Sequence, residues 1–272
     1  MIIHWNFDPV LIAVGPLVIR WYGLLFVGAF LAGQALLTRM FKAEGIPQEN
    51  AERLLLYALL GTIVGARLAH CLFYDPQYYL SHPLAILRLW EGGLASHGGA
   101  AGMLLSLWLG TRVLRPRMPF LWLVDRVSVP AALGAVFVRV ANFLNSEIVG
   151  IPTSGGWGVV FEAVDKLPRH PVQLYEAVAY LVVFLILAVL YRRLGQRTPH
   201  GLLFGVFLML VFSARFALEF YKVHQAAYPS GQLLSVGQYL SLPFVVLGAV
   251  MVLWSTGYLK GRSVGREKPA RL

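Results

Sequence analysis

The amino-acid sequence predicts an all-α, polytopic membrane protein with seven transmembrane helices. Of its 272 residues, 58% are hydrophobic and only 13% are charged, whereas a soluble domain carries about 25% charged residues. The apolar residues gather in runs of about 20, which is the length that a helix needs to cross a bilayer. A soluble two-domain enzyme, a disordered chain and a DNA-binding domain are therefore all poor fits.

Seven segments have the length and composition of a membrane span, and loops that contain Pro and Gly separate them. They are residues 17–37, 54–73, 94–114, 120–144, 172–191, 202–220 and 238–258. Residues 1–10 contain an Asp and no Lys or Arg, so the first segment lacks the basic flank of a secretory signal. No repeat divides the chain, which predicts one integral membrane domain over residues 1–272 with a basic cytoplasmic tail at 259–272.

The distribution of basic residues predicts that the N-terminus lies outside and the C-terminus inside, with short periplasmic elements between the spans. Cytoplasmic loops of membrane proteins are enriched in Lys and Arg. With this orientation, 15 of the 23 Lys and Arg residues lie in inner loops, inner span ends or the tail, and the other eight are Arg20, Arg67, Arg88, Arg139, Lys166, Arg169, Arg215 and Lys222. The net charge of +10 then faces anionic membrane lipid, and we expect no nucleic-acid partner.

Polar residues that are unusual inside spans all fall in the outer half of the bilayer in this orientation. They come from six of the spans or from the residues directly after them: Tyr22, Arg67, His70, His97, Arg139, Asn142, Asn145, Glu147, Gln173, Glu176, Arg215 and Glu219. Ionisable residues inside a membrane are costly and usually face an interior cavity. This convergence at one depth therefore predicts a functional site toward the outer leaflet.

Several of these residues also have purely structural interpretations. Arg215 and Glu219 are spaced i,i+4 and can form an ion pair on one helix, and Arg139 can extend to the outer interface. Asn145 can hydrogen-bond between helices, and the glycines of the two GxxxG patterns, at 61–65 and 98–102, suit close helix packing.

The chemistry of the cluster suits an anionic ligand. Signatures of a hydrolase, a zinc protease and an NTPase are absent from the sequence, and the single cysteine, Cys71, excludes an intramolecular disulfide and a CxxC site. No set of His, Cys and carboxylate residues has the spacing of metal ligands, so we expect no metal and no cofactor. Arginine binds phosphate through a planar fork of donors, which points to a phospholipid headgroup.

At these same positions the chain resembles the prolipoprotein diacylglyceryl transferases of bacteria. The longest match is RVANFLNSEIVG at residues 139–150. The others, in order along the chain, are WYG at 21–23, GAR at 65–67, EGGL at 91–94, HGG at 97–99, RHPxQLYE at 169–176, RFxxEF at 215–220 and GQxLS at 237–241. The sequence departs from the family pattern at Val138, Val211 and Lys222, where Gly, Tyr and Arg are usual.

The resemblance implies a transferase of the bacterial inner (plasma) membrane whose active site opens toward the periplasm. Such an enzyme moves the diacylglyceryl group of phosphatidylglycerol to the lipobox cysteine thiol of a prolipoprotein, which forms a thioether and releases glycerol phosphate. The partners implied are phosphatidylglycerol, prolipoproteins and membrane lipid. A free thiol has a pKa near 8.5 and needs a base or a positive field to become a thiolate, while Arg contacts strengthen as the leaving phosphate gains charge.

The resemblance also implies roles for individual residues. The catalytic set comprises Arg139, Arg215, His97, Tyr22 and Glu219, with the two arginines on the phosphate, Glu219 orienting Arg215, and Tyr22 and His97 near the attacked carbon. His97 is either the base for the thiol or a hydrogen-bond donor to the headgroup. The substrate-binding set comprises Arg139, Asn142, Glu147, Gly150, Gly98, Gly99, Arg67, Gln173 and Glu176.

Two other functions are alternatives to the diacylglyceryl transferase. A transporter or flippase for an anionic lipid is the alternative, but transporters place polar sites at the bilayer midplane, often with inverted repeats, and no repeat is visible here. An acyltransferase or intramembrane hydrolase lacks a plausible Ser or Cys nucleophile.

Overall fold

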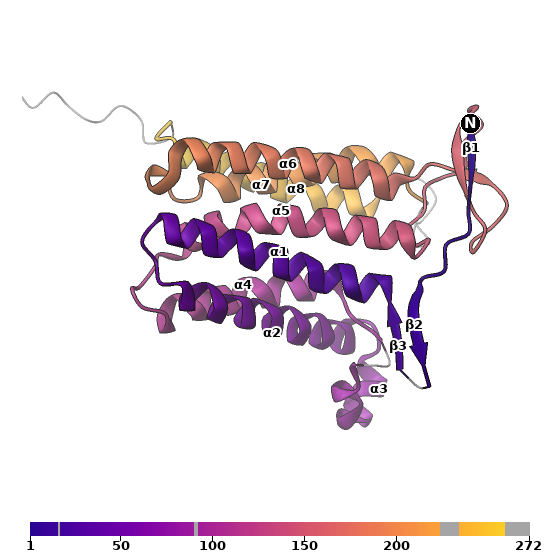
Figure 1. Ribbon diagram of the computed structural model, residues 1–272, viewed down its shortest axis with the longest axis horizontal. Coiled ribbons are helices and arrows are strands. Elements are labelled where there is room, and N and C mark those ends of the chain that lie inside the picture. The colour runs from indigo at the N-terminus through magenta and orange to yellow at the C-terminus, as the bar shows by residue number, and fades with distance from the viewer. Residues whose placement is uncertain (16, 90–91, 224–233, 259–272) are drawn as a thin grey trace, which may run out of the picture. The chain divides into compact units, whose positions relative to one another are not determined.

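The computed structural model describes residues 1–15, 17–89, 92–223 and 234–258, and it is mostly helical (Figure 1). Long helices occupy the segments predicted to span the membrane: α1 (Trp21–Ala43), α2 (Gln48–Phe73), α4 (Ser96–Val113), α5 (Phe120–Leu144), α6 (Val172–Leu194), α7 (Leu202–Leu218) and α8 (Val236–Ser255). All of these except α4 are long and apolar enough to cross a bilayer. The chain is therefore a multi-pass membrane protein. The less apolar α4, which contains several glycines and begins with a His, stays a prediction as a seventh span.

The first predicted span begins too early. Residues 17–20 form strand β3 (Leu17–Arg20), which pairs antiparallel with β2 (Val10–Val14), and α1 begins only at Trp21. Gly15 between the two strands has a φ of +58°, a left-handed conformation that glycine adopts readily. Both strands are rich in Val and Ile, which favour strands and also raise the apolarity of the segment, so apolarity alone could not separate strand from span.

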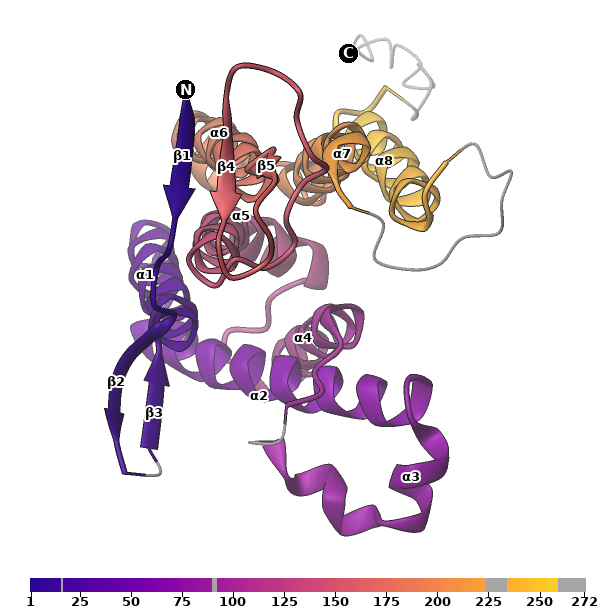
Figure 2. The same cartoon turned by 90° about the vertical axis from the view of Figure 1, so that its right-hand side faces the viewer.

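The residues fall into two compact units, and the first comprises Met1–Leu25 and Ala135–Leu272. Its second sheet has the order β1-β4-β5, with β1 (Ile2–Trp5) parallel to β4 (Gly158–Phe161) and β5 (Pro168–Arg169) antiparallel to β4 (Figure 2). The all-α prediction is thus right for the spanning helices, while the segments outside them also form short strands.

Within the first unit α7 packs against both α6 and α8. The approach of α7 to α8 is closest at two glycines. A Cβ at Gly248 would lie only 2.6 Å from the carbonyl oxygen of Gly205, so both positions need a small residue. Small residues let helices pack closely in a membrane.

The second unit comprises Phe26–Gly134, and its main helix pair is α2 with α4. A Cβ at Gly65 would lie 2.3 Å from the carbonyl oxygen of Gly98, and one at Gly61 would lie 2.6 Å from that of Gly102. The interpretation of both GxxxG patterns as helix-packing faces is confirmed. Between α2 and α4 the chain forms a short helix, α3 (Pro76–Ser81), and a 3-10 helix, η1 (Pro83–Leu87).

Candidate active site

The first unit contains a buried charge cluster whose centre is Glu176 on α6. The Oε2 atom of Glu176 lies 3.1 Å from Nε of Arg139 on α5, and the carboxylate is fully buried. Its Oε1 atom accepts hydrogen bonds from Nζ of Lys222 at 2.8 Å and from the hydroxyl of Tyr180 at 3.4 Å. One carboxylate therefore links two cations that come from different parts of the chain.

A second carboxylate extends the cluster to the start of α8. Nζ of Lys222 lies 3.5 Å from Oε2 of Glu219, which belongs to the 3-10 helix η4 (Glu219–Tyr221) that follows α7. The hydroxyl of Ser235 donates to Oε1 of Glu219 at 3.2 Å. Ser235 also caps α8 through a reciprocal capping box with Gln238, so the end of α7 and the start of α8 are tied together.

Asn142 connects Arg139 to the turn that follows α5. Its Oδ1 atom accepts from Nη1 of Arg139 at 3.2 Å, and its Nδ2 atom donates to Oε2 of Glu147 at 3.0 Å. Nδ2 of Asn145 donates to the other oxygen of Glu147 at 3.1 Å. Asn145 therefore makes a local contact with Glu147 and not the hydrogen bond between helices that its sequence position suggested. Glu147 itself is exposed.

Residues predicted to bind substrate hold this turn in place. The buried Gln173 donates from Nε2 to the carbonyl oxygen of Glu147 at 2.6 Å. A Cβ at Gly150 would lie 2.4 Å from the carbonyl oxygen of His170, and Nη1 of Arg169 donates to the carbonyl oxygen of Gly150 at 3.0 Å. Gln173 and Gly150 thus shape the backbone around Glu147, and the packing explains why position 150 is a glycine.

Asp165 stabilises the loop that carries Arg169. Both carboxylate oxygens of Asp165 accept hydrogen bonds from Nε of Arg169, at 3.2 and 3.1 Å. The Arg169 guanidinium lowers the pKa of the Asp165 carboxyl below its usual value, because the positive charge and the hydrogen bonds favour the ionised form.

Two further site residues lie within electrostatic reach of the cluster. The Tyr22 hydroxyl interacts electrostatically with Glu147 and Arg139, and Arg215 interacts in the same way with the Tyr180 hydroxyl. The guanidinium of Arg139 lies 6.0 Å from the centroid of the Tyr180 ring. In the part of the chain that the structure describes, no ion pair joins Arg215 to Glu219, because Glu219 contacts Lys222 and Ser235 instead.

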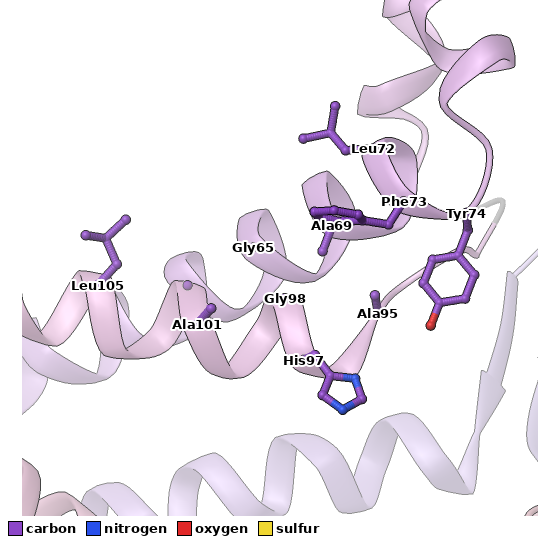
Figure 3. A pocket seen from close by; sticks show the side chains of 11 residues that line it. Gly65, Ala69, Leu72, Phe73, Tyr74, Ala95, His97, Gly98, Ala101 and Leu105 are labelled. Atoms are coloured by element: carbon purple, nitrogen blue, oxygen red, sulfur yellow. The ribbon is translucent and has the colours of Figure 1, made fainter. Parts of the chain in front are cut away.

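The remaining predicted site residues belong to the second unit, where His97 and Gly98 line a cavity of about 540 Å³ between α2 and α4. His97 is exposed at the start of α4, and Tyr74 lies just after the end of α2, at the same end of the cavity as His97 and opposite Leu105 (Figure 3). Its other lining residues are small or apolar.

Gly98 and Gly99 were expected to contact the headgroup, and the structure places both inside α4 against α2. A Cβ at Gly98 would lie 2.2 Å from Cβ of Ala69, and one at Gly99 would lie 3.3 Å from the methyl group of Thr62. Helix packing is therefore sufficient to explain both glycines.

Arg67 is 2% exposed and donates to backbone carbonyl oxygens, not to a carboxylate. Its acceptors are the carbonyl groups of Ala85, Ile86, Arg88, Gly92 and Gly93. A guanidinium has five N–H donors, so the expected contact with a headgroup has no free donor.

Sequence reasoning assigned no role to Lys222, Tyr180, Ser235 or Gln238. Lys222 was noted only as a departure from the family pattern, although a basic residue three positions after Glu219 was a usable signal for an ion pair. Ser235 and Gln238 have the spacing of a capping box, which is also readable from sequence. Among the described residues no group of three or more His, Cys, Asp or Glu side chains could hold a metal ion.

Comparisons with known proteins identify the family. The model of the family "Prolipoprotein diacylglyceryl transferase" matches residues 9–254. Proteins named phosphatidylglycerol–prolipoprotein diacylglyceryl transferase are similar to this chain over nearly their whole length. The one from Tolumonas auensis is 54% identical, covering 93% of this chain and 97% of the relative. The one from Chloroherpeton thalassium is 46% identical (93% and 94%), and one from Bacteroides fragilis is 40% identical (96% and 97%). With a family model that covers most of its length and relatives this similar, the chain belongs to the prolipoprotein diacylglyceryl transferase family.

Proposed function

We propose that this protein transfers the diacylglyceryl group of phosphatidylglycerol to the lipobox cysteine of prolipoproteins. The names of its relatives supply the substrates. The observation that carries the proposal on this chain is the fixed guanidinium of Arg139. Glu176 and Asn142 contact Nε and Nη1, and the side chain keeps 14% exposure, which leaves donors for the oxygens of a phosphate.

The reaction needs one new bond and one broken bond. The sulfur of the substrate cysteine attacks the terminal glyceryl carbon that carries the phosphate ester. The carbon–oxygen bond breaks, and its electron pair leaves on glycerol phosphate, whose phosphate changes from a diester to a monoester. The added negative charge develops next to Arg139 and Arg215. Contacts that strengthen as charge develops lower the barrier.

The proton of the thiol must leave before or during the attack. His97 is our candidate base, because it is exposed at the edge of a cavity and an imidazole nitrogen can accept a proton. Its alternative role is hydrogen bonding to the headgroup. Tyr22 interacts electrostatically with Glu147 and Arg139 in the first unit, and we propose that it contacts the substrate there.

We also propose the finer layout of the protein in the membrane. The less apolar α4 crosses the bilayer as a seventh span, the N-terminus lies outside, and the C-terminus lies in the cytoplasm, because most Lys and Arg residues then face inward. The two compact units form a single integral domain in the bacterial inner membrane, and the site opens toward the outer leaflet. A periplasm-dependent reporter fused after Leu272 that is active would contradict this orientation.

The test of the function is transfer by the purified protein. Phosphatidylglycerol and a lipobox peptide are supplied, and we expect the peptide to gain the mass of one diacylglyceryl group. A peptide with serine in place of the lipobox cysteine is the control and should stay unmodified. EDTA should not reduce the rate of transfer. If EDTA abolished the activity and zinc restored it, the mechanism would be contradicted.

A lipid flippase is the alternative function, and the same preparation distinguishes it. In vesicles without peptide, a flippase moves labelled phosphatidylglycerol between leaflets, whereas the transferase leaves its distribution unchanged. Movement of lipid with no peptide modification would favour the alternative.

A further inference from the structure

All five N–H donors of Arg67 are occupied by the backbone of one segment. Nε donates to the carbonyl oxygen of Ile86 at 2.9 Å. Nη2 donates to Ala85 at 2.7 Å and to Arg88 at 3.1 Å, and Nη1 donates to Gly93 at 3.3 Å and also to Gly92. The guanidinium also lies 5.1 Å from the centroid of the Tyr79 ring. The buried guanidinium of Arg67 thus donates hydrogen bonds to five backbone carbonyl groups of this segment.

The accepting carbonyl groups belong to a part of the chain that makes few backbone hydrogen bonds of its own, such as that from the N–H of Arg88 to the carbonyl oxygen of Ala85. They lie at the end of η1 and in the connection to α4, where Gly92 and Gly93 have φ angles of +83° and +75°. A Cβ at Gly93 would lie 2.5 Å from the His70 ring and 3.0 Å from Nη1 of Arg67. The two glycines therefore let the backbone close tightly around the guanidinium.

The surroundings of this segment make unsatisfied carbonyl groups costly. It follows α2, a helix apolar enough to span a membrane, and the short helix α3. The large side chains Leu80 of α3 and Leu84 and Leu87 of η1 are each at least 70% exposed. Such side chains suit contact with lipid, where backbone groups need partners from the protein because water is scarce. Arg67 supplies these partners from the protein side.

The same segment leads directly into the start of α4. The backbone N–H of Ala95 donates to the carbonyl oxygen of Ala66 at 3.0 Å, so the connection is fastened to α2 beside Arg67. His97 follows two residues later. The position of the His97 side chain therefore depends on the backbone at residues 92–95, which Arg67 and Ala66 contact.

We propose that Arg67 is a positioning residue that fixes the backbone at residues 85–88 and 92–93 and thereby the place of His97 at the edge of the cavity. It acts through His97 and does not touch the headgroup. This inference rests on the proposed function, because it assumes that His97 takes part in transfer.

The test compares Arg67→Lys with Arg53→Lys, an exposed arginine on the same helix, in two measurements. Lysine keeps the charge but presents its donors from a single nitrogen, so it cannot reach five carbonyl groups. We expect faster hydrogen exchange of amides in residues 76–89 and 92–95 in Arg67→Lys only. We also expect kcat to fall by up to about 100-fold, the effect of a misplaced reacting group, with little change in the KM for phosphatidylglycerol.

A double-mutant cycle connects the loop to His97. If Arg67 acts through His97, Arg67→Lys should reduce kcat no further in a His97→Gln background. If the two substitutions reduce kcat independently, so that their effects multiply, the inference is overturned. It is also overturned if Arg67→Lys leaves the amide exchange rates unchanged and raises the KM for phosphatidylglycerol, because that result would indicate a headgroup contact. Full activity of His97→Gln would overturn the role of His97 in both proposals. If the wild-type protein transfers nothing, the proposed function fails, whereas the exchange rates still show whether Arg67 holds the loop.

Discussion

The Oε2 atom of Glu176 lies 3.1 Å from Nε of Arg139, and the carboxylate that makes this contact is fully buried. Because Nε is the inner nitrogen of the guanidinium, the contact leaves the two terminal nitrogens for other acceptors, of which Asn142 is one. Glu176 was predicted to contact substrate. Its burial between two cations favours a different role, in which it orients Arg139.

Arg139→Lys should reduce turnover almost as much as Arg139→Ala. A lysine supplies one point charge and cannot replace a fork that contacts Glu176, Asn142 and a phosphate together. Losing one donor to a developing negative charge costs about 100- to 1,000-fold in rate. The measurement is transfer rate at equal amounts of folded protein, with Arg192→Lys, an exposed residue at the end of α6, as the matched control. If Arg139 only extends to the interface, Lys should be nearly neutral.

Glu176→Gln should destabilise the protein, because it leaves the buried Lys222 and the partly buried Arg139 with less negative charge. Breaking a buried ion pair from one side costs about 3–5 kcal/mol. Thermal unfolding in detergent should show a clear drop in Tm, with the exposed Glu49→Gln unchanged. Replacing Lys222 with Met in the Glu176→Gln protein should restore part of the loss. An unchanged Tm for Glu176→Gln would show that the cluster does not stabilise the fold.

The sequence was sufficient to predict the six helices that are long and apolar enough to span a membrane, and much of the cluster. Apolar runs identify helices because every backbone group in a bilayer must be satisfied internally. The depth of each polar residue along its span was enough to group Arg139, Asn142, Glu147, Glu176 and Glu219, which the structure connects.

What the sequence could not predict depends on contacts between distant residues. Strand β1 pairs with β4 across more than half of the chain, and a four-residue strand has no local signal strong enough to reveal its partner. The partners of Glu219 were missed for a related reason. Helical spacing favoured Arg215, but Glu219 begins a 3-10 turn at the end of α7, and its contacts are Lys222 and Ser235.

Gly237→Ala should lower turnover although alanine favours helices more than glycine does. Its Cβ would lie 2.3 Å from Oε1 of Glu219, so the carboxylate must move. A displacement of about 1 Å near a reacting centre can cost up to about 100-fold in rate. The control is Gly156→Ala, where nothing lies within 4 Å of a Cβ. Equal rates for both variants would show that the position of Glu219 is not critical.

The contribution of Asp165 to stability should disappear in acid. Its pKa is lowered in the folded protein by Arg169, so the stabilisation is present above the ordinary Asp value of about 3.9 and is lost as the pH falls through the lower, folded value. Asp165→Asn should therefore have a slightly lower Tm than the wild type at neutral pH and the same Tm once the pH lies below the folded value. A difference in Tm that persists there would mean that the carboxylate charge is not the cause.

Exchanging Arg215 and Glu219 should fail to rescue activity. An ion pair confined to one helix would survive the exchange, because both orders of charge at i,i+4 spacing can attract. In the structure Glu219 contacts Lys222 and Ser235, so an arginine at 219 would face the Lys222 ammonium. A glutamate at 215 would offer no donor to a phosphate. We expect Arg215→Lys to reduce transfer strongly and Arg215→Glu/Glu219→Arg to abolish it, with the amount of folded protein checked by gel filtration and Tm. An unpaired charge also lowers stability, so rates are compared only between variants that melt above the assay temperature. Full activity of Arg215→Lys would remove Arg215 from the phosphate site, and activity of the exchanged protein would restore the simple helical ion pair.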